Sequence, residues 1–399
     1  MPSPIPNEIL SEIFSNLNFE TENYFIPSQK DLFSCLLVNQ QWCVNAIKVL
    51  WAEPMPVDKD RDMLRIYAKV IRMYLLSIDG QDKQQLIDYG HRFANSNSKN
   101  SRRFQKSLQI LYGSKDYPTS QSAHVLNDLP TSQKSLLSSY TNTQSSHTLL
   151  FDYPSFLRYL DLDRLLLGIV HLINPRAKSR QFGDILIFQA ILKMLAKRCK
   201  NLLSLVIDNQ MEDSLTRFDD MFIMLNPEVL PLIYPIKETF ITINFPINKI
   251  FLTLSCFCKH LEYIEITTIQ QFNLQETDNS GIASLIVSQI SLRTLVLRGS
   301  FQFLDQILYA LPSQSASLKD LTFSCADFSE CAPLHSIAAC KNLRELRFWE
   351  CYNLSDEICE PLVNCEFEKL RVIDLEETHS KILMEWKNKR ENKEDNKLG

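Results

Sequence analysis

The chain has 399 residues, of which 45% are apolar and 22% charged, and its formal net charge at pH 7 is −5. The length predicts two or three globular domains, and the acidic balance argues against a general nucleic-acid binder. Only 8 glycines are present and none form a Gly-x-Gly pair, which excludes the usual dinucleotide-binding and phosphate-cradling loops.

The N-terminus lacks a basic segment followed by an apolar one, and no apolar run approaches the ~20 residues of a membrane helix. We therefore expect an intracellular protein of the cytoplasm or nucleus. Eleven cysteines are present, and in a reducing compartment we expect them to be free thiols.

Three short helices are predicted within residues 1–52. Apolar residues at positions 9, 10, 13, 14 and 17 form one stripe, and Pro6 suits a first helical turn. A second helix is expected after the capping-box-like start at 28–31, and a third from about Asn39 to Leu50. Three such helices carry more large apolar side chains than they can bury. They are either a helical cap for the rest of the chain or a docking module for another protein.

Three segments of this region resemble the F-box motif: Pro-x-Glu-Ile-Leu-x-x-Ile-Phe-x-x-Leu at 6–17, Leu-x-Val-Asn-x-x-Trp at 36–42, and Leu-Trp at 50–51. Ile5 departs from the usual leucine, and the connection from Leu17 to Leu32 is longer than usual. F-box domains bind the Skp-type adaptor of cullin–RING ubiquitin ligases. The resemblance implies that the adaptor contacts, mixed with the module's own core, are among Pro6, Ile9, Leu10, Ile13, Phe14, Leu36, Val38 and Trp42.

Residues 53–112 are expected to form a helical linker region. Its clearest element is an amphipathic helix over 60–77, which would join the first module rigidly to the remainder. Residues 113–148 are rich in Ser and Thr and predict a surface loop, with a phosphorylated regulatory segment as the alternative. Residues 387–399 are expected to be a flexible tail.

A Leu-x-x-Leu-x-Leu pattern recurs through the second half of the chain, with Ile or Phe as substitutes. The last four copies begin at positions 292, 318, 343 and 370, a spacing of 25 to 27 residues, and earlier copies begin at 157, 202, 261 and, more weakly, 236. Cys199, Cys258 and Cys340 each stand three residues before a first leucine. The pattern resembles the cysteine-containing leucine-rich repeat. This implies an α/β fold in which residues 149–386 form a solenoid with a parallel concave sheet and convex helices.

Alternation along the strands would expose one set of side chains on the concave face. From that set we expect the substrate contacts to include Tyr263, Glu265, Arg298, Arg347, Trp349 and Asp374. Trp349 beside Arg347 is the best anchor candidate, because Trp and Arg dominate interface hot spots. The alternative is that Trp349 packs on neighbouring repeats and binds nothing.

Cys325, Cys331, His335 and Cys340 invite a zinc interpretation, but no Cys-x-x-Cys pair occurs and buried packing is favoured. Neither Gly-x-Ser-x-Gly nor His-Glu-x-x-His is found. We therefore expect no catalytic residue, no cofactor, no metal, and neither a nucleic-acid nor a membrane partner.

Both resemblances predict the same function, a substrate-recognition subunit of an SCF-type ubiquitin ligase. Its first module would bind the Skp-type adaptor and its repeats a protein substrate destined for ubiquitin-dependent degradation, without bond chemistry of its own. One alternative is a leucine-rich-repeat scaffold outside any ligase. Another is an enzyme built on the solenoid, which a buried pocket of convergent titratable groups would favour.

Overall fold

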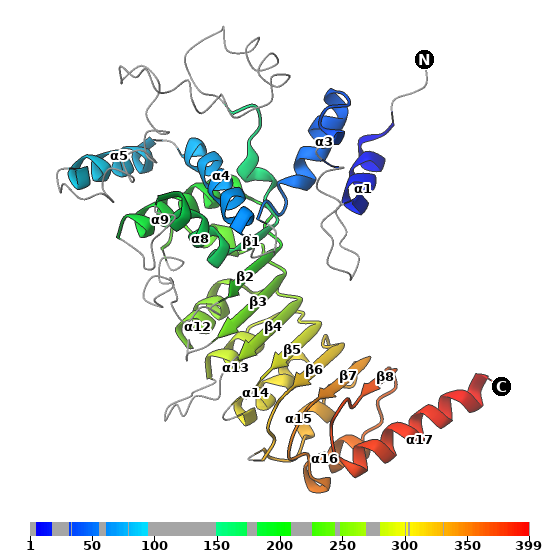
Figure 1. Ribbon diagram of the computed structural model, residues 1–399. Helices are drawn as coiled ribbons and strands as arrows, with labels where there is room; N and C mark the ends of the chain where they lie inside the picture. Colours follow the sequence, from blue (N-terminus) through cyan, green and yellow to red (C-terminus); the bar gives the residue numbers. More distant parts are fainter. Residues whose placement is uncertain are drawn as a thin grey trace. The chain divides into compact units, whose positions relative to one another are not determined.

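The computed structural model describes residues 5–17, 32, 34–55, 61–78, 80–94, 149–173, 182–208, 226–243, 248–268, 280–299, 301, 304–329 and 331–398 (Figure 1). The expected Ser/Thr-rich loop at 113–148 lies outside these residues. The chain divides into two compact units, one holding residues 1–54, 155–166 and 195–399, the other 55–154 and 167–194. This division groups residues 167–194, expected within the solenoid, with the linker region.

The first unit contains an eight-stranded parallel sheet whose strands follow one another in chain order (Figure 1). Each copy of the repeated pattern, the weak one included, supplies one strand, so the predicted α/β class and parallel sheet are confirmed. The strands are β1 (Tyr159–Asp161), β2 (Ser204–Asp208), β3 (Glu238–Ile243), β4 (Tyr263–Thr268), β5 (Thr294–Arg298), β6 (Asp320–Ser324), β7 (Glu345–Trp349) and β8 (Val372–Asp374).

The strand register places the second leucine position of each copy next to that of the neighbouring copy. Seven of these eight side chains are buried. The aligned residues are Leu160, Leu205, Thr239, Ile264, Leu295, Leu321, Leu346 and the half-buried Ile373. Thr239 explains why the third copy is weak in sequence. Its buried hydroxyl donates to the carbonyl of Leu205 at 3.3 Å, which satisfies the polar group inside the core.

Helices connect the strands, and from residue 248 onward each helix packs on the next one in chain order. They are α8 (Leu162–Ile173), α9 (Phe182–Arg198), α11 (Leu230–Ile233), α12 (Asn248–Phe257), α13 (Ser280–Val287), α14 (Leu304–Ala310), α15 (His335–Ala338) and α16 (Asp356–Val363), with 3-10 turns η3 (Tyr153–Phe156) and η5 (Leu311–Gln314). Figure 1 shows α12, α13 and α14 in a row along one side of the sheet. The apolar core therefore lies between this row and the strands.

The cysteines that precede the repeated leucines are buried free thiols with a structural role. Each donates to a backbone carbonyl of the preceding copy: Cys199 to Leu157 at 3.3 Å, Cys258 to Ile233 at 3.4 Å, and Cys340 to Leu311 at 3.7 Å. A small side chain with a weak donor both fills this space and satisfies a carbonyl.

A helix follows the last strand of the sheet. α17 (Lys381–Leu398) continues through the segment that was expected to be flexible. Leu383 and Trp386 are buried, and the Arg390 guanidinium donates to the carbonyl oxygens of Phe367 at 2.7 Å and of Leu370. These contacts hold the first half of α17 on the last copy, so the helix has a partner that a polar sequence pattern does not reveal.

The second unit is helical, with α4 (Arg61–Ser77), α5 (Gly80–Ala94) and most of α8 and α9. The predicted amphipathic helix is confirmed as α4, whose buried residues include Tyr67, Ile71 and Tyr74. A Cβ atom at Gly168 would lie 2.9 Å from Ile71 Cγ1, so glycine is required where α8 approaches α4. None of the described helices is both long and apolar enough to cross a membrane.

Candidate functional site

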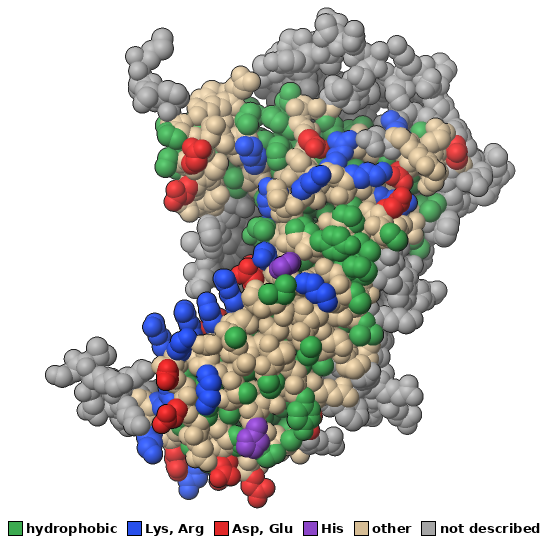
Figure 2. Space-filling model, turned by 180° about the vertical axis from the view of Figure 1, so that it is seen from behind, with side chains coloured by type: hydrophobic (Ala, Val, Ile, Leu, Met, Phe, Trp, Pro, Cys, Tyr) green, Lys and Arg blue, Asp and Glu red, His purple; other side chains and the backbone are tan. Residues whose placement is uncertain are grey.

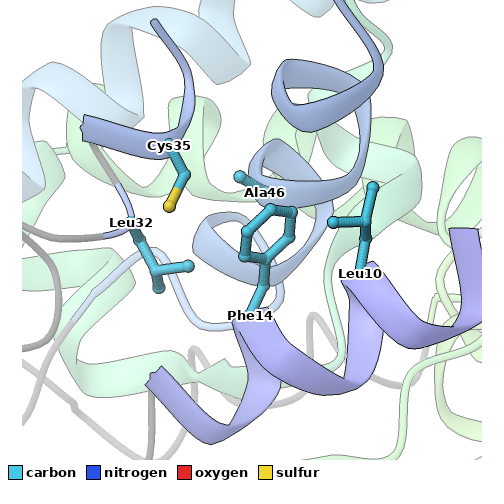
Figure 3. Close-up of a cluster of buried hydrophobic side chains, with 5 residues drawn as sticks. All are labelled: Leu10, Phe14, Leu32, Cys35 and Ala46. Carbon is cyan, nitrogen blue, oxygen red and sulfur yellow. The ribbon is translucent and has the colours of Figure 1, made fainter. Parts of the chain in front are cut away.

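The N-terminal helices pack around a small core of their own. α1 (Asn7–Leu17) and α3 (Gln40–Leu50) enclose it, with a helical turn between them in which the Leu36 N–H donates to the Leu32 carbonyl. Figure 3 shows the core side chains pointing toward one another; they are Leu10, Phe14, Leu32, Cys35 and Ala46. Trp42 covers this core, with its ring edge-on to Phe14 at a centroid distance of 5.3 Å. The three-helix prediction is supported in its first and third members.

A polar network fixes α1 on α3. The Asn7 side-chain oxygen accepts from Gln41 Nε2 and Asn45 Nδ2, both at 3.0 Å, and Gln41 Nε2 also donates to the Ile5 carbonyl at 2.7 Å. Asn45 is buried, so its bonds are not exchanged with water. The Asn39 side chain caps α3 by accepting from the Trp42 N–H. These bonds set the rotation of α1, and with it which apolar residues face outward.

The structure sorts the eight expected adaptor contacts into three groups. Leu10 and Phe14 are fully buried in the module's core and are not available to a partner. Leu36 and Trp42 are half-buried and pack against that core. The remaining four are exposed: Pro6, Ile9, Ile13 and Val38.

Three further apolar side chains join the exposed group. Ile5 is 42% exposed, Leu37 is 73% exposed and Val44 is 36% exposed. Ile9 and Ile13 lie four residues apart and so follow one side of α1, beside the side that buries Leu10 and Phe14; Ile5 has the same spacing but precedes the helix, which begins at Asn7. We call Ile5, Ile9, Ile13, Leu37 and Val38 the apolar surface. The sequence motif pointed to α1 but did not separate these two sides.

On the sheet, register brings all six expected substrate contacts into one network. The Trp349 indole N–H donates to Asp374 Oδ2 at 2.9 Å, between neighbouring strands. The guanidinium carbons of Arg298 and Arg347 lie 5.7 and 5.8 Å from the Trp349 ring centroid, within cation–π range. Trp349 is therefore held between two cations and a carboxylate.

Glu265 connects the rest of the network. It accepts from Arg298 Nε at 2.9 Å and from the Tyr263 hydroxyl. Burial, followed by the hydrogen bond to Glu265 and its negative charge, raises the pKa of Tyr263 above its ordinary value. The phenol therefore remains a neutral donor at physiological pH.

Ser324 is a residue of this site that sequence reasoning missed. It lies between Arg298 and Trp349 in the register of β5, β6 and β7. Its small side chain leaves room for the Arg298 guanidinium to reach the ring two strands away. Alignment of the repeated copies is the signal that could have found it. Arg347 also pairs with Glu345 on its own strand.

This arrangement offers donors, acceptors and an aromatic face with both charge signs, which suits recognition of a protein surface.

The cavity beside α13 and α14 has a volume of about 530 Å³. Its lining is Ser280, Ala283, Ser284, Val287, Ser288 and Gln306, which contains no Asp, Glu, His, Cys or Lys. Among the described residues, no three or more His, Cys, Asp or Glu side chains gather closely enough to hold a metal ion. Searches against protein-family models and against curated protein sequences find no match for this chain.

Proposed function

We propose that this chain is the substrate-recognition subunit of an SCF-type cullin–RING ubiquitin ligase. In this proposal the N-terminal helices are an F-box that binds a Skp-type adaptor. The sheet and its helices are a leucine-rich-repeat solenoid whose concave face binds a protein substrate. The observation that carries the proposal is the division of α1 into a buried side, with Leu10 and Phe14, and an exposed apolar side, with Ile9 and Ile13.

An exposed apolar side beside a complete core supports docking rather than loose packing. Leu10 and Phe14 are 0% exposed, so the module does not need Ile9, Ile13 or Val38 to fill its interior. Burying one such side chain on a partner contributes roughly 1.5–3 kcal/mol when burial is complete. Several together suffice for a stable complex, and rimmed apolar patches commonly mark protein interfaces.

The sheet supports the second half of the proposal by its size and chemistry. Eight strands are present, and at about 4.8 Å per interval they span roughly 34 Å, enough for a protein or extended peptide. The network around Trp349 lies on this face. The contribution to ubiquitin transfer would be proximity alone, because one chain holds adaptor and substrate at once.

Binding to a purified Skp-type adaptor tests the proposal. In the triple variant Ile9→Ala, Ile13→Ala, Val38→Ala, we expect the adaptor affinity to fall at least about tenfold, because three interface side chains are truncated. The matched control is Val287→Ala with Ile290→Ala, two exposed apolar residues outside the N-terminal helices (56% and 67% exposed). We expect the control to bind as wild type does.

Equal binding by the triple variant and wild type would contradict the assignment of the apolar surface. If wild type itself does not bind the adaptor but still captures a partner through the sheet, the chain is a leucine-rich-repeat scaffold outside any ligase. An enzyme on the same fold would show turnover that depends on titratable side chains of the sheet face.

A further inference from the structure

Basic residues directly precede six of the eight strands. They are Arg158, Lys237, Arg293, Lys319, Arg344 and Arg371, while Leu203 and Glu262 occupy the other two positions. Figure 2 shows Lys and Arg side chains in a stepped row along one edge of the molecule. The last four of these residues belong to consecutive copies, and we call Arg293, Lys319, Arg344 and Arg371 the basic ladder.

Backbone hydrogen bonds stack the basic ladder directly. The Lys319 N–H donates to the Arg293 carbonyl at 2.8 Å, Arg344 to Lys319 at 2.6 Å, and Arg371 to Arg344 at 2.8 Å. Each step therefore equals one strand spacing of about 4.8 Å, and four residues span roughly 14 Å. A basic residue therefore recurs at every step along the row formed by the N-terminal ends of β5 to β8.

Within the described part of the chain, only one of these four cations has an ion-pair partner. Arg293 pairs with Glu262 at 3.0 Å. Among the residues that the structure describes, no carboxylate lies within 4.0 Å of Lys319, Arg344 or Arg371. Arg344 and Arg371 are exposed and Lys319 is half-buried. Like charges stacked across neighbouring strands repel, so this edge is arranged at a cost to the folded state.

We infer that the basic ladder binds an acidic segment of a partner protein, rich in Asp and Glu, in extended conformation. Carboxylates at alternate positions of an extended chain lie about 6.8 Å apart, so three of them span about 14 Å. That span matches the whole four-residue ladder, whereas Lys319 and Arg371, the outer two of the three cations without a described ion-pair partner, lie two steps or roughly 10 Å apart. Flexible Lys and Arg side chains absorb the small difference in step.

A short acidic segment fits this edge better than a nucleic acid does. The whole chain has a net charge of −5 and a pI of about 5.9. The next position in this row beyond Arg293 is Glu262, whose carbonyl accepts the Arg293 N–H at 2.9 Å. A long polyanion extending past the ladder on that side meets the Glu262 carboxylate, whereas two or three carboxylates bound along the ladder do not.

The inference deepens the proposed function, because it gives the chemical class of the substrate segment. It rests on that proposal only in identifying the bound segment as the substrate's. Adaptor binding is therefore measured on every variant, so that loss of peptide binding and loss of adaptor binding are seen separately.

The test uses the full chain and a fluorescent twelve-residue peptide of alternating Glu and Ser, read by anisotropy at low salt and at about 0.15 M ionic strength. A Gln–Ser peptide is the neutral control. We expect the Glu–Ser peptide alone to bind, more weakly at the higher salt. In the variant K319E/R344E/R371E we expect the affinity to fall at least about tenfold.

The matched control variant is K69E/R72E/K389E, which reverses three exposed basic residues elsewhere and changes the net charge equally. We expect less than about a twofold effect from it. The variant K319Q/R344Q/R371Q replaces the charge-reversed one if the latter fails to fold. The inference is overturned if wild type does not bind the peptide, if the control variant loses binding equally, or if the ladder variant binds as wild type does. It is also overturned if a duplex oligonucleotide binds the ladder more tightly than the peptide.

Discussion

The carbonyl oxygen of Ala52 accepts the backbone N–H of Tyr159 at 3.0 Å, and it also accepts that of Arg158 at 2.9 Å. The same bond pair recurs at every later strand; the Arg158 carbonyl, for example, accepts from Leu203 and Ser204. The segment after α3 therefore takes the position that would otherwise belong to a preceding strand. It pairs with the start of β1, the edge strand, by giving the N–H groups of Arg158 and Tyr159 an acceptor.

From this relationship we expect slow amide exchange at the start of β1. The N–H groups of Arg158 and Tyr159 should exchange at rates comparable to those of Leu203 and Ser204, as measured by hydrogen exchange. In a chain lacking residues 1–52, protection should fall at the first pair and persist at the second. Equal protection with and without residues 1–52 would show that Ala52 does not close this edge in solution.

The two sides of α1 predict losses of stability of very different size from similar truncations. Leu10→Ala removes a fully buried side chain and should lower the free energy of unfolding of the N-terminal helices by about 2–5 kcal/mol. Ile13→Ala removes a side chain that is 41% exposed and should cost under about 1 kcal/mol. Denaturant unfolding monitored at Trp42 measures both. A large effect of Ile13→Ala would mean that the apolar surface is already buried within the chain.

Gln314 is predicted to be a key polar residue of the core. Its side chain, 2% exposed, donates to the carbonyls of Ile286 and Gln289 at 3.0 and 2.8 Å and accepts from the Leu292 N–H at 3.2 Å. Gln314→Leu would leave these buried groups unsatisfied and should destabilise the sheet unit by about 2–3 kcal/mol. The exposed Gln306, substituted in the same way, is the control. Comparable thermal melting of the two variants would contradict the prediction.

Because several thiols are buried, we expect the free energy of unfolding to decrease at alkaline pH. Burial raises the pKa of Cys340 from 9.0 to about 12. Above pH 9 the unfolded thiol loses its proton while the folded thiol keeps it. The stability that the neutral thiol contributes is therefore complete below pH 9 and is lost as the pH rises toward about 12.

In Cys340→Ala, we expect the free energy of unfolding to fall less steeply over this range, by roughly 1 kcal/mol per pH unit. Urea unfolding at several pH values measures the slope. Cys256→Ala, at an exposed position, is the matched control variant. Identical slopes for Cys340→Ala and wild type would show that this thiol does not titrate differently in the two states.

Several elements were predictable because neighbouring residues suffice to specify them. The eight strands followed from the leucine pattern, and even the weak copy with Thr239 became β3. α4 followed from its apolar periodicity. By contrast, the helical continuation of α17 was missed, because Arg390 is held by carbonyls more than twenty residues earlier. The roles of the F-box-like residues and of the sheet-face network in binding remain predictions.

The amino-acid sequence by itself determined the strand positions and which strand residues point to the same face, because an alternating chain fixes both locally. Only the tertiary structure decided which α1 residues are core and which form the apolar surface. The apolar positions 9, 10, 13 and 14 form a stripe too wide to be buried on α3 as a whole. The hydrogen bond from Asn45 to Asn7 sets the rotation of α1 about its own axis and so selects which part of the stripe is buried. The tertiary structure also decided that Arg298 contacts Trp349 and that the four residues of the basic ladder stack, because only strand register brings residues from separate copies within reach of one another.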